Sequence, residues 1–159
     1  MGDEILKVEN LRTSFMTSAG EVKAVDGVSC SVRRGEVLGI VGESGSGKTA
    51  AMLSIMGLTG ENSNVKADNI SFMDESLTTE KIKNLRGDKI SMIFQDPMTS
   101  LNPVLSAGYQ LKEILRRHKW KGNINERVTE MMTRVGIVPA EERIDLSVNV
   151  EKESFRTYY

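Results

Sequence analysis

The sequence has little of several features that define whole classes of protein. It contains a single cysteine, Cys30, so an internal disulfide is excluded and a reducing compartment is expected. No apolar run approaches the roughly 18 residues needed to cross a bilayer, and the acidic start Gly2-Asp3-Glu4 lacks the pattern of a signal peptide. These shortages predict a cytoplasmic protein, one that can still dock on a membrane protein.

An excess of charge of one sign is also missing. Lysine and arginine total 21 and aspartate and glutamate total 22, which gives a net charge of −1. That balance argues against nucleic acid as a partner, and we interpret the basic residues between Lys112 and Lys121 as a solvated face. With 159 residues, of which 39% are hydrophobic, the chain is long enough for one ordinary domain with a core.

What the sequence does contain is a glycine-rich motif at Gly42–Thr49, which fits G-x-x-x-x-G-K-[ST] at every fixed position. The apolar run Val37–Val41 before it predicts a strand, and Ala50–Met56 after it predicts a helix that begins near Lys48 and ends near Gly57. A glycine-rich turn that matches by chance is expected on the order of once in 200 chains of this length. We therefore interpret the motif as a phosphate-binding loop.

The chemistry of this loop follows from its residue types. Gly42, Gly45 and Gly47 lack a Cβ, so the backbone can curl and direct its N–H groups inward, and the start of the helix adds further N–H groups. We expect Lys48 to reach the β- and γ-phosphates and the Thr49 hydroxyl to ligate Mg²⁺. The predicted nucleotide-binding residues here are Gly42, Glu43, Ser44, Gly45, Ser46, Gly47, Lys48, Thr49 and Ala50.

Several short strands are predicted before the motif. Ile5–Thr17 alternates imperfectly and predicts one antiparallel strand, Ser18–Gly20 predicts a turn, and Glu21–Ala24 predicts the start of the return. Val28–Val32 predicts a further strand and Arg33–Glu36 a turn into the strand before the phosphate loop. This order resembles the start of an ABC-type ATPase, in which a small β-subdomain carries an aromatic residue that stacks on adenine.

The resemblance places Phe15, which lies 27 residues before Gly42, at the position of the stacking aromatic; the alternative is an ordinary sheet aromatic. Further on, Thr59–Asp68 predicts a loop and Asn69–Glu75 a strand that mimics a Walker B signal. In ABC-type ATPases the Walker B strand comes much later in the chain. We therefore expect Asp74 and Glu75 to form a turn at the end of a strand in the antiparallel sheet.

A second informative stretch is Lys89–Pro97, an apolar strand that ends in Gln95 before the break at Pro97. Phe94–Pro103 resembles the Q-loop of one ABC subgroup, the importers of dipeptides, oligopeptides and nickel. The resemblance implies ATP and Mg²⁺ as cofactors and makes Gln95 a catalytic ligand of Mg²⁺ or of the attacking water. It also implies a peripheral place on the inner face of the cell membrane, with transmembrane permease subunits and a second ATP-binding subunit as partners.

Beyond Pro103 the apolar period becomes helical, which resembles the helical subdomain of the same family. Asn123 or Asn125 is predicted to cap the second helix, Gly136 to stop it, and Pro139 to begin a short helix through Ile144. His118 comes too early to be the switch histidine of the family. The two predicted apolar faces are Leu111, Ile114, Leu115 and His118, followed by Val128, Met131, Met132 and Val135.

The expected fold class is therefore α/β, a P-loop NTPase of the ABC type. We expect part of the nucleotide-binding core in residues 1–103, part of the helical subdomain in 104–144 and a divergent tail in 145–159. Leu146-Ser147 is followed by Val148–Val150 where the family has the glycine pair of its signature, and no later Walker B, catalytic glutamate or switch histidine follows. The chain is expected to be a truncated ATP-binding component that energises peptide import, or alternatively a non-catalytic remnant or interaction module.

Overall fold

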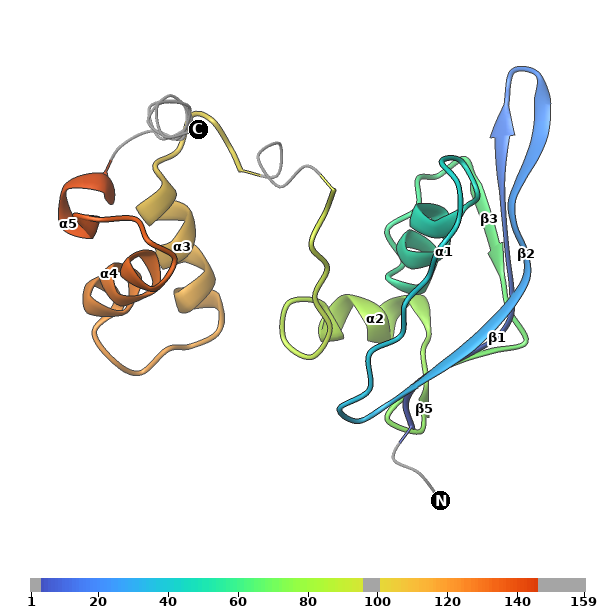
Figure 1. Ribbon diagram of the computed structural model, residues 1–159, viewed down its shortest axis with the longest axis horizontal. Coiled ribbons are helices and arrows are strands. Elements are labelled where there is room, and N and C mark those ends of the chain that lie inside the picture. Colours follow the sequence, from blue (N-terminus) through green and yellow to red (C-terminus); the bar gives the residue numbers. More distant parts are fainter. Residues whose placement is uncertain (1–3, 96–100, 146–159) are drawn as a thin grey trace. The chain divides into compact units, whose positions relative to one another are not determined.

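The computed structural model describes residues 4–95 and 101–145, and the chain divides into two compact units, Met1–Ser91 and Met92–Tyr159 (Figure 1). Each unit has its own cluster of buried apolar residues. Asp96 to Ser100 of the predicted Q-loop, and the predicted tail beyond Asp145, lie outside the described residues. The predicted domain boundary at residue 103 lies within the second unit.

The first unit is organised around one long strand, β1 (Glu4–Thr17). It pairs antiparallel with β2 (Gly20–Arg33), β3 (Ser63–Lys66) and β4 (Asn69–Phe72), and β5 (Glu75–Ser76) pairs with β4. The register runs from Thr17 opposite Gly20 to Glu4 opposite Arg33. The predicted antiparallel subdomain and its hairpin turn are thereby confirmed.

Two details of this sheet differ from the sequence-based expectation. The separate strands predicted at Glu21–Ala24 and Val28–Val32 are one continuous strand, β2, because register shifts absorb the irregular residues without ending the ladder. Gly27, with φ of 77°, lies at one of these shifts. The predicted loop Thr59–Asp68 contains β3, whose four residues are too few for their alternation to be recognised.

Two predicted strands do not form among the described residues. Val37–Val41 has no strand partner there, and Val37 and Val41 are 93% and 97% exposed. Lys89–Gln95 likewise pairs only through an isolated bridge between Arg86 and Ile90. The physical reason is that a strand is held by hydrogen bonds to a neighbour, so an apolar run of the right length is not sufficient.

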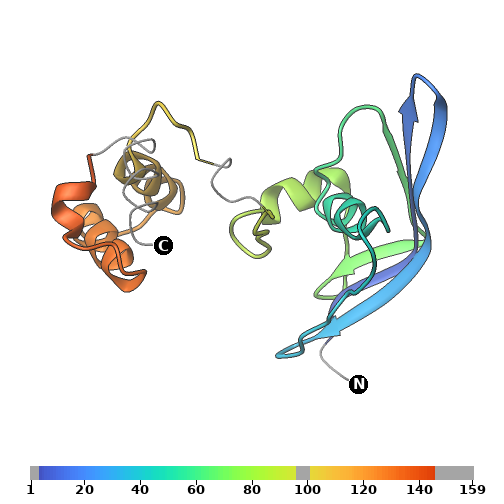
Figure 2. The ribbon, with the colours of Figure 1, turned by 45° about the horizontal axis from the view of Figure 1, so that its top comes forward.

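The predicted helix after the phosphate loop is confirmed as α1 (Lys48–Ile55), which packs on one face of the sheet (Figure 1, Figure 2). The shared core consists of Val8, Leu11, Val25, Ala51 and Ile55. The same interface contains a buried hydrogen bond of 2.7 Å between the hydroxyls of Thr13 and Ser54. Helix α2 (Thr79–Leu85) follows the sheet, with Thr78 as its cap and Ile82 buried.

The second unit contains three helices among its described residues: α3 (Ala107–Arg117), α4 (Ile124–Arg134) and α5 (Ala140–Arg143). The predicted cap of α4 is confirmed, because the Asn123 side chain accepts from the N–H groups of Asn125 and Glu126. Gly136, the predicted stop, has φ of 83°. The core consists of Leu115, Val128, Met132, Ala140 and Ile144.

The two predicted apolar helix faces include more residues than the structure buries. Ile114 is 53% exposed, and His118 and Val135 are exposed as well, so the buried part of each face is narrower than the spacing of its residues. Three short helices bury only a narrow stripe on each, and the residues at its margin stay in contact with solvent. None of the described helices is long and apolar enough to traverse a bilayer.

Candidate functional site

The loop at Gly42–Gly47 ends where α1 begins, and its last residue must be glycine. Gly47 is the residue before the helix and has φ of 89°, a left-handed conformation that other residues rarely adopt. A Cβ on Gly47 would also overlap the carbonyl oxygen of Ala24 in β2. The loop therefore lies directly against the backbone of β2, and this contact fixes where α1 begins.

The N-terminus of α1 is left without a side-chain cap, because Gly47 has no side chain to offer. In any helix the first N–H groups lack partners within the helix, and here the first turn includes Thr49 and Ala50. The Thr49 side chain is exposed, whereas Ala50 packs against the core. A helix start of this kind favours an anion.

The Lys48 ammonium is held inside the curve of the loop. Its Nζ donates to the carbonyl oxygens of Gly42 and Glu43, both at 2.7 Å, and to the Ser46 hydroxyl at 3.1 Å. Ser46 N in turn donates to Glu43 O at 3.2 Å, which closes the turn. Of the predicted loop residues, Glu43, Ser44, Gly45 and Ser46 are exposed and Lys48 is half-buried. A cation is thus positioned beside a helix start that favours negative charge.

A cavity of about 500 Å³ opens beside this loop, between β1, β2 and α1. Its walls are mostly apolar, and the loop contributes Gly42, Ser46, Gly47 and Lys48. Cys30 also lines it, and burial raises the pKa of this thiol. A ligand held by the loop would therefore have apolar surface next to it.

Two further predicted site residues, Phe15 and Gln95, lie outside the phosphate loop. Phe15 lies in β1, half-buried and opposite Val22 and Ser63. Side chains alternate along a strand, so Phe15 shares the face of Thr13, the face that α1 covers. Gln95 is exposed and belongs to the second unit, so the structure does not join it to Thr49.

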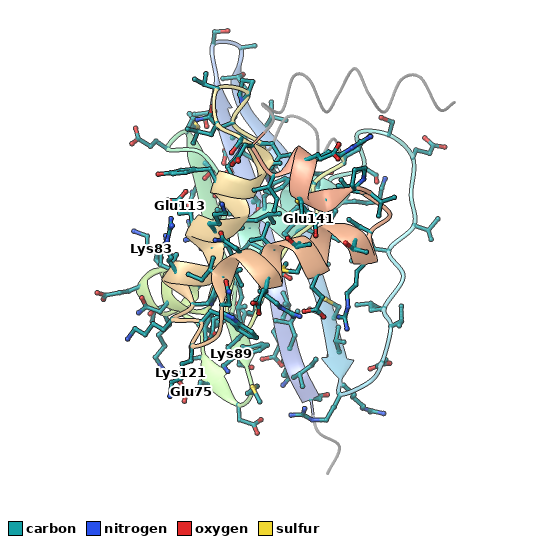
Figure 3. The ribbon with its side chains drawn as sticks, turned by 90° about the vertical axis from the view of Figure 1, so that its left-hand side faces the viewer. Glu75, Lys83, Lys89, Glu113, Lys121 and Glu141 are labelled. Carbon is teal, nitrogen blue, oxygen red and sulfur yellow. The ribbon has the colours of Figure 1, made fainter. Side chains whose placement is uncertain are left out.

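The pair Asp74-Glu75 lies where the sequence placed it, in the antiparallel sheet. Asp74 occupies the turn between β4 and β5 with φ of 64°. Glu75, which Figure 3 labels, pairs with Lys81 at 3.2 Å. Among residues 4–95 and 101–145, no group of three or more histidine, cysteine, aspartate or glutamate side chains is arranged so that it could hold a metal ion. A metal at the loop would depend on the Thr49 hydroxyl and on phosphate oxygens, which suits Mg²⁺.

Sequence reasoning missed Gln110, which organises the end of the predicted Q-loop segment. Its side-chain oxygen accepts from Asn102 N at 3.0 Å, and its amide nitrogen donates to Asn102 O at 3.1 Å. The same nitrogen donates to Leu105 O at 3.3 Å. A single glutamine on an amphipathic helix gives no signal for this role, because the contact depends on how the chain enters α3.

Comparison with known proteins agrees with this arrangement. Residues 25–151 match the sequence pattern of the ABC transporter family. The chain is 41% identical over 149 residues to the dipeptide transport ATP-binding protein DppD of Lactococcus lactis, and 45% identical over 148 residues to that of Bacillus subtilis. It is 41% identical over 148 residues to the oligopeptide transport ATP-binding protein OppD of Escherichia coli.

These alignments cover most of this chain but less than half of each relative. They include 90%, 89% and 91% of the chain, and 43%, 44% and 44% of the three relatives in the same order. The chain therefore spans under half the length of the curated relatives it matches.

Proposed function

Because the chain belongs to the ABC transporter family, we propose that Gly42–Thr49 binds the phosphates of ATP for a peptide importer. The observation that carries this proposal is the position of Lys48, whose Nζ is held at 2.7 Å from two loop carbonyls beside the uncapped start of α1. Phosphate oxygens can replace those neutral acceptors with charged ones, and charge-assisted hydrogen bonds are the stronger kind.

The other predicted residues have complementary parts in this proposal. Mg²⁺ neutralises charge on the β- and γ-phosphates when it is bound, and the Thr49 hydroxyl is the ligand that the loop offers to it. Phe15 is proposed to stack on adenine, and its place on the α1 face of β1 supports this. Gln95 is proposed to orient water or metal with its neutral amide. Mg-ATP is therefore the proposed cofactor.

The proposed partners follow from the family and from the names of the relatives, which are dipeptide and oligopeptide transport ATP-binding proteins. We infer transmembrane permease subunits and a second ATP-binding subunit as partners, and a peripheral location on the cytoplasmic face of the membrane. Since positive and negative charges balance, nucleic acid is not proposed.

A second candidate, nucleotide binding without hydrolysis, is favoured by where the carboxylates lie. The Asp-Glu pair that follows an apolar run, Asp74-Glu75, forms a hairpin end, and Glu75 is already paired with Lys81. Hydrolysis needs a carboxylate that holds the metal's water shell and another that polarises the attacking water. The chain alone is proposed to bind Mg-ATP without turning it over.

Calorimetric titration of Mg-ATP into the parent chain and a Lys48→Ala variant tests phosphate binding. Removing the ammonium deletes hydrogen bonds to a charged ligand, worth about 1.5–3 kcal/mol, so affinity should fall about 10- to 100-fold. Lys83→Ala is the matched control, because Lys83 is an exposed lysine on α2 (Figure 3). Equal affinity of folded Lys48→Ala and the parent would refute the proposal.

A further inference from the structure

The end of α3 and the residues that follow it form an exposed, basic segment around a tryptophan. We call Arg116–Lys121 the basic turn; all six of its residues are exposed, and Lys121 is labelled in Figure 3. Residues 112–121 include five lysines and arginines and one acidic residue, Glu113. A chain with a net charge of −1 therefore concentrates positive charge at one end of α3.

The basic turn is ordered by backbone hydrogen bonds at the end of α3. The N–H of Lys119 donates to Arg116 O and that of Trp120 donates to Leu115 O, both at 3.0 Å. Lys119 has φ of 53°, so these bonds form a Schellman motif with a lysine at the left-handed position. Glycine is the usual residue there, because it takes positive φ without steric cost. Local stability therefore favours glycine at position 119 and does not account for the lysine.

The Trp120 ring is held in place while much of it stays in contact with solvent. The Arg127 guanidinium lies 5.1 Å from the ring centroid, and a Cβ on Gly122 would come within 2.8 Å of the indole Nε1. Trp120 is nevertheless 45% exposed, and its Nε1 has no hydrogen-bond partner in the described part of the chain. An indole with an apolar body and an unpaired N–H is the kind of side chain found at membrane–water interfaces.

The charge of the basic turn is not neutralised within the protein. Among residues 4–95 and 101–145, its four lysines and arginines form no ion pair and no side-chain hydrogen bond. Glu130 on α4 is already paired with two arginines of its own helix. Arg116 and Arg117 lie in the last turn of α3, where the helix dipole favours cations. Lys119 and Lys121 lie beyond the helix and have no such local role.

We propose that the basic turn docks on an anionic lipid bilayer, with Trp120 at the level of the headgroups. Each lysine or arginine is attracted to the anionic surface, and the indole ring and its N–H match the apolar and polar sides of the interface. Nucleic acid is the other polyanion that such a surface could meet. A membrane is favoured because Ile114, one turn earlier in α3, adds an aliphatic side chain that is 53% exposed. This contact is independent of the phosphate loop and of the proposed permease subunits.

Trp120 is the one tryptophan of the chain, so its fluorescence reports on this contact directly. The full chain is titrated with vesicles of phosphatidylcholine alone and of phosphatidylcholine mixed with phosphatidylserine. The anionic vesicles should shift the Trp120 emission to shorter wavelength, and added salt should weaken their binding. Lys119→Gln with Lys121→Gln should lower the affinity roughly 30-fold, about fivefold for each lysine.

The matched control is Lys23→Gln with Lys83→Gln, which changes the net charge equally at two exposed lysines of the first unit and should leave the affinity almost unchanged. Lys119→Gly separates charge from folding. It should stabilise the end of α3, because glycine suits the positive φ, and still weaken binding about fivefold.

Three results would overturn the proposal. The first is the absence of an emission shift with anionic vesicles, and the second is an equal loss of affinity in the Lys119/Lys121 variant and in the Lys23/Lys83 control. The third is tighter binding of a DNA duplex than of anionic vesicles at the same salt concentration, which would assign the basic turn to nucleic acid instead.

Discussion

Replacing Gly47 with alanine tests whether the phosphate loop is held against the sheet by a contact that only glycine permits. At φ of 89° an alanine is strained by roughly 1–2 kcal/mol. Its Cβ would in addition overlap Ala24 O, a backbone atom that cannot rotate away, and forced shifts of this kind cost about 1–3 kcal/mol. The expected loss of unfolding free energy is therefore about 2–5 kcal/mol.

Gly35→Ala is the control that separates the cost of backbone strain at positive φ from the cost of the overlap between the Cβ and Ala24 O. Gly35 has φ of 76°, similar to Gly47, but a Cβ there meets no atom within 4 Å. Its expected cost is the conformational part alone, about 1–2 kcal/mol. The lower backbone entropy of the unfolded chain applies to both variants and cancels in their difference.

Urea unfolding followed by circular dichroism near 218 nm measures this difference in the first unit. Trp120, the one tryptophan, belongs to the second unit, so its fluorescence provides an internal reference that should not move. A loss of several kcal/mol is a large part of the stability of a typical domain and is easily measured. Equal losses for Gly47→Ala and Gly35→Ala would refute the reasoning, because they would show that the loop does not rest on β2.

Three further predictions concern the binding of adenine, the hydrolysis of ATP and the stability of the second unit. Phe15→Ala should weaken ATP binding by roughly 0.5–1.5 kcal/mol in a calorimetric titration and spare inorganic triphosphate; parallel losses would make Phe15 structural. The purified 159-residue chain should release no phosphate from ATP above its Lys48→Ala variant, and release that Asp74→Asn abolishes would contradict this. Asn123→Ala should lower the stability of the second unit by about 1 kcal/mol through loss of the α4 cap, measured by Trp120 fluorescence. Asn125→Ala, on the same helix, should have a much smaller effect.

The parts of the fold that could be predicted are those encoded in neighbouring residues. A glycine that must take a positive φ before a helix, as at Gly47, is recognised from the few residues around it. The Asn123 cap and the Gly136 stop are local in the same sense. The β1–β2 hairpin is also local, because its two strands adjoin in sequence across a short turn.

The parts that could not be predicted depend on pairing between distant residues. Val37–Val41 has the composition of a buried strand, but nothing in those five residues states whether a neighbouring strand is present. The placement of Arg12 opposite Asp26 in β2 and opposite Lys66 in β3 is likewise hidden, because a shift of register by one residue would move each side chain to the other face. The sequence likewise predicts that Gln95 and Thr49 act at one Mg²⁺ site, but it cannot show whether the fold brings the two side chains together.

The exposure of Val37–Val41 has a consequence for the behaviour of the protein in solution. An apolar, uncharged stretch with free backbone donors and acceptors is a template on which a strand from another copy can form. Glu36 and Glu43 flank the stretch, and repulsion between these carboxylates on adjacent copies opposes such stacking. Because salt screens that repulsion, self-association should increase with both protein concentration and ionic strength, and buffers of low salt should keep the chain monomeric.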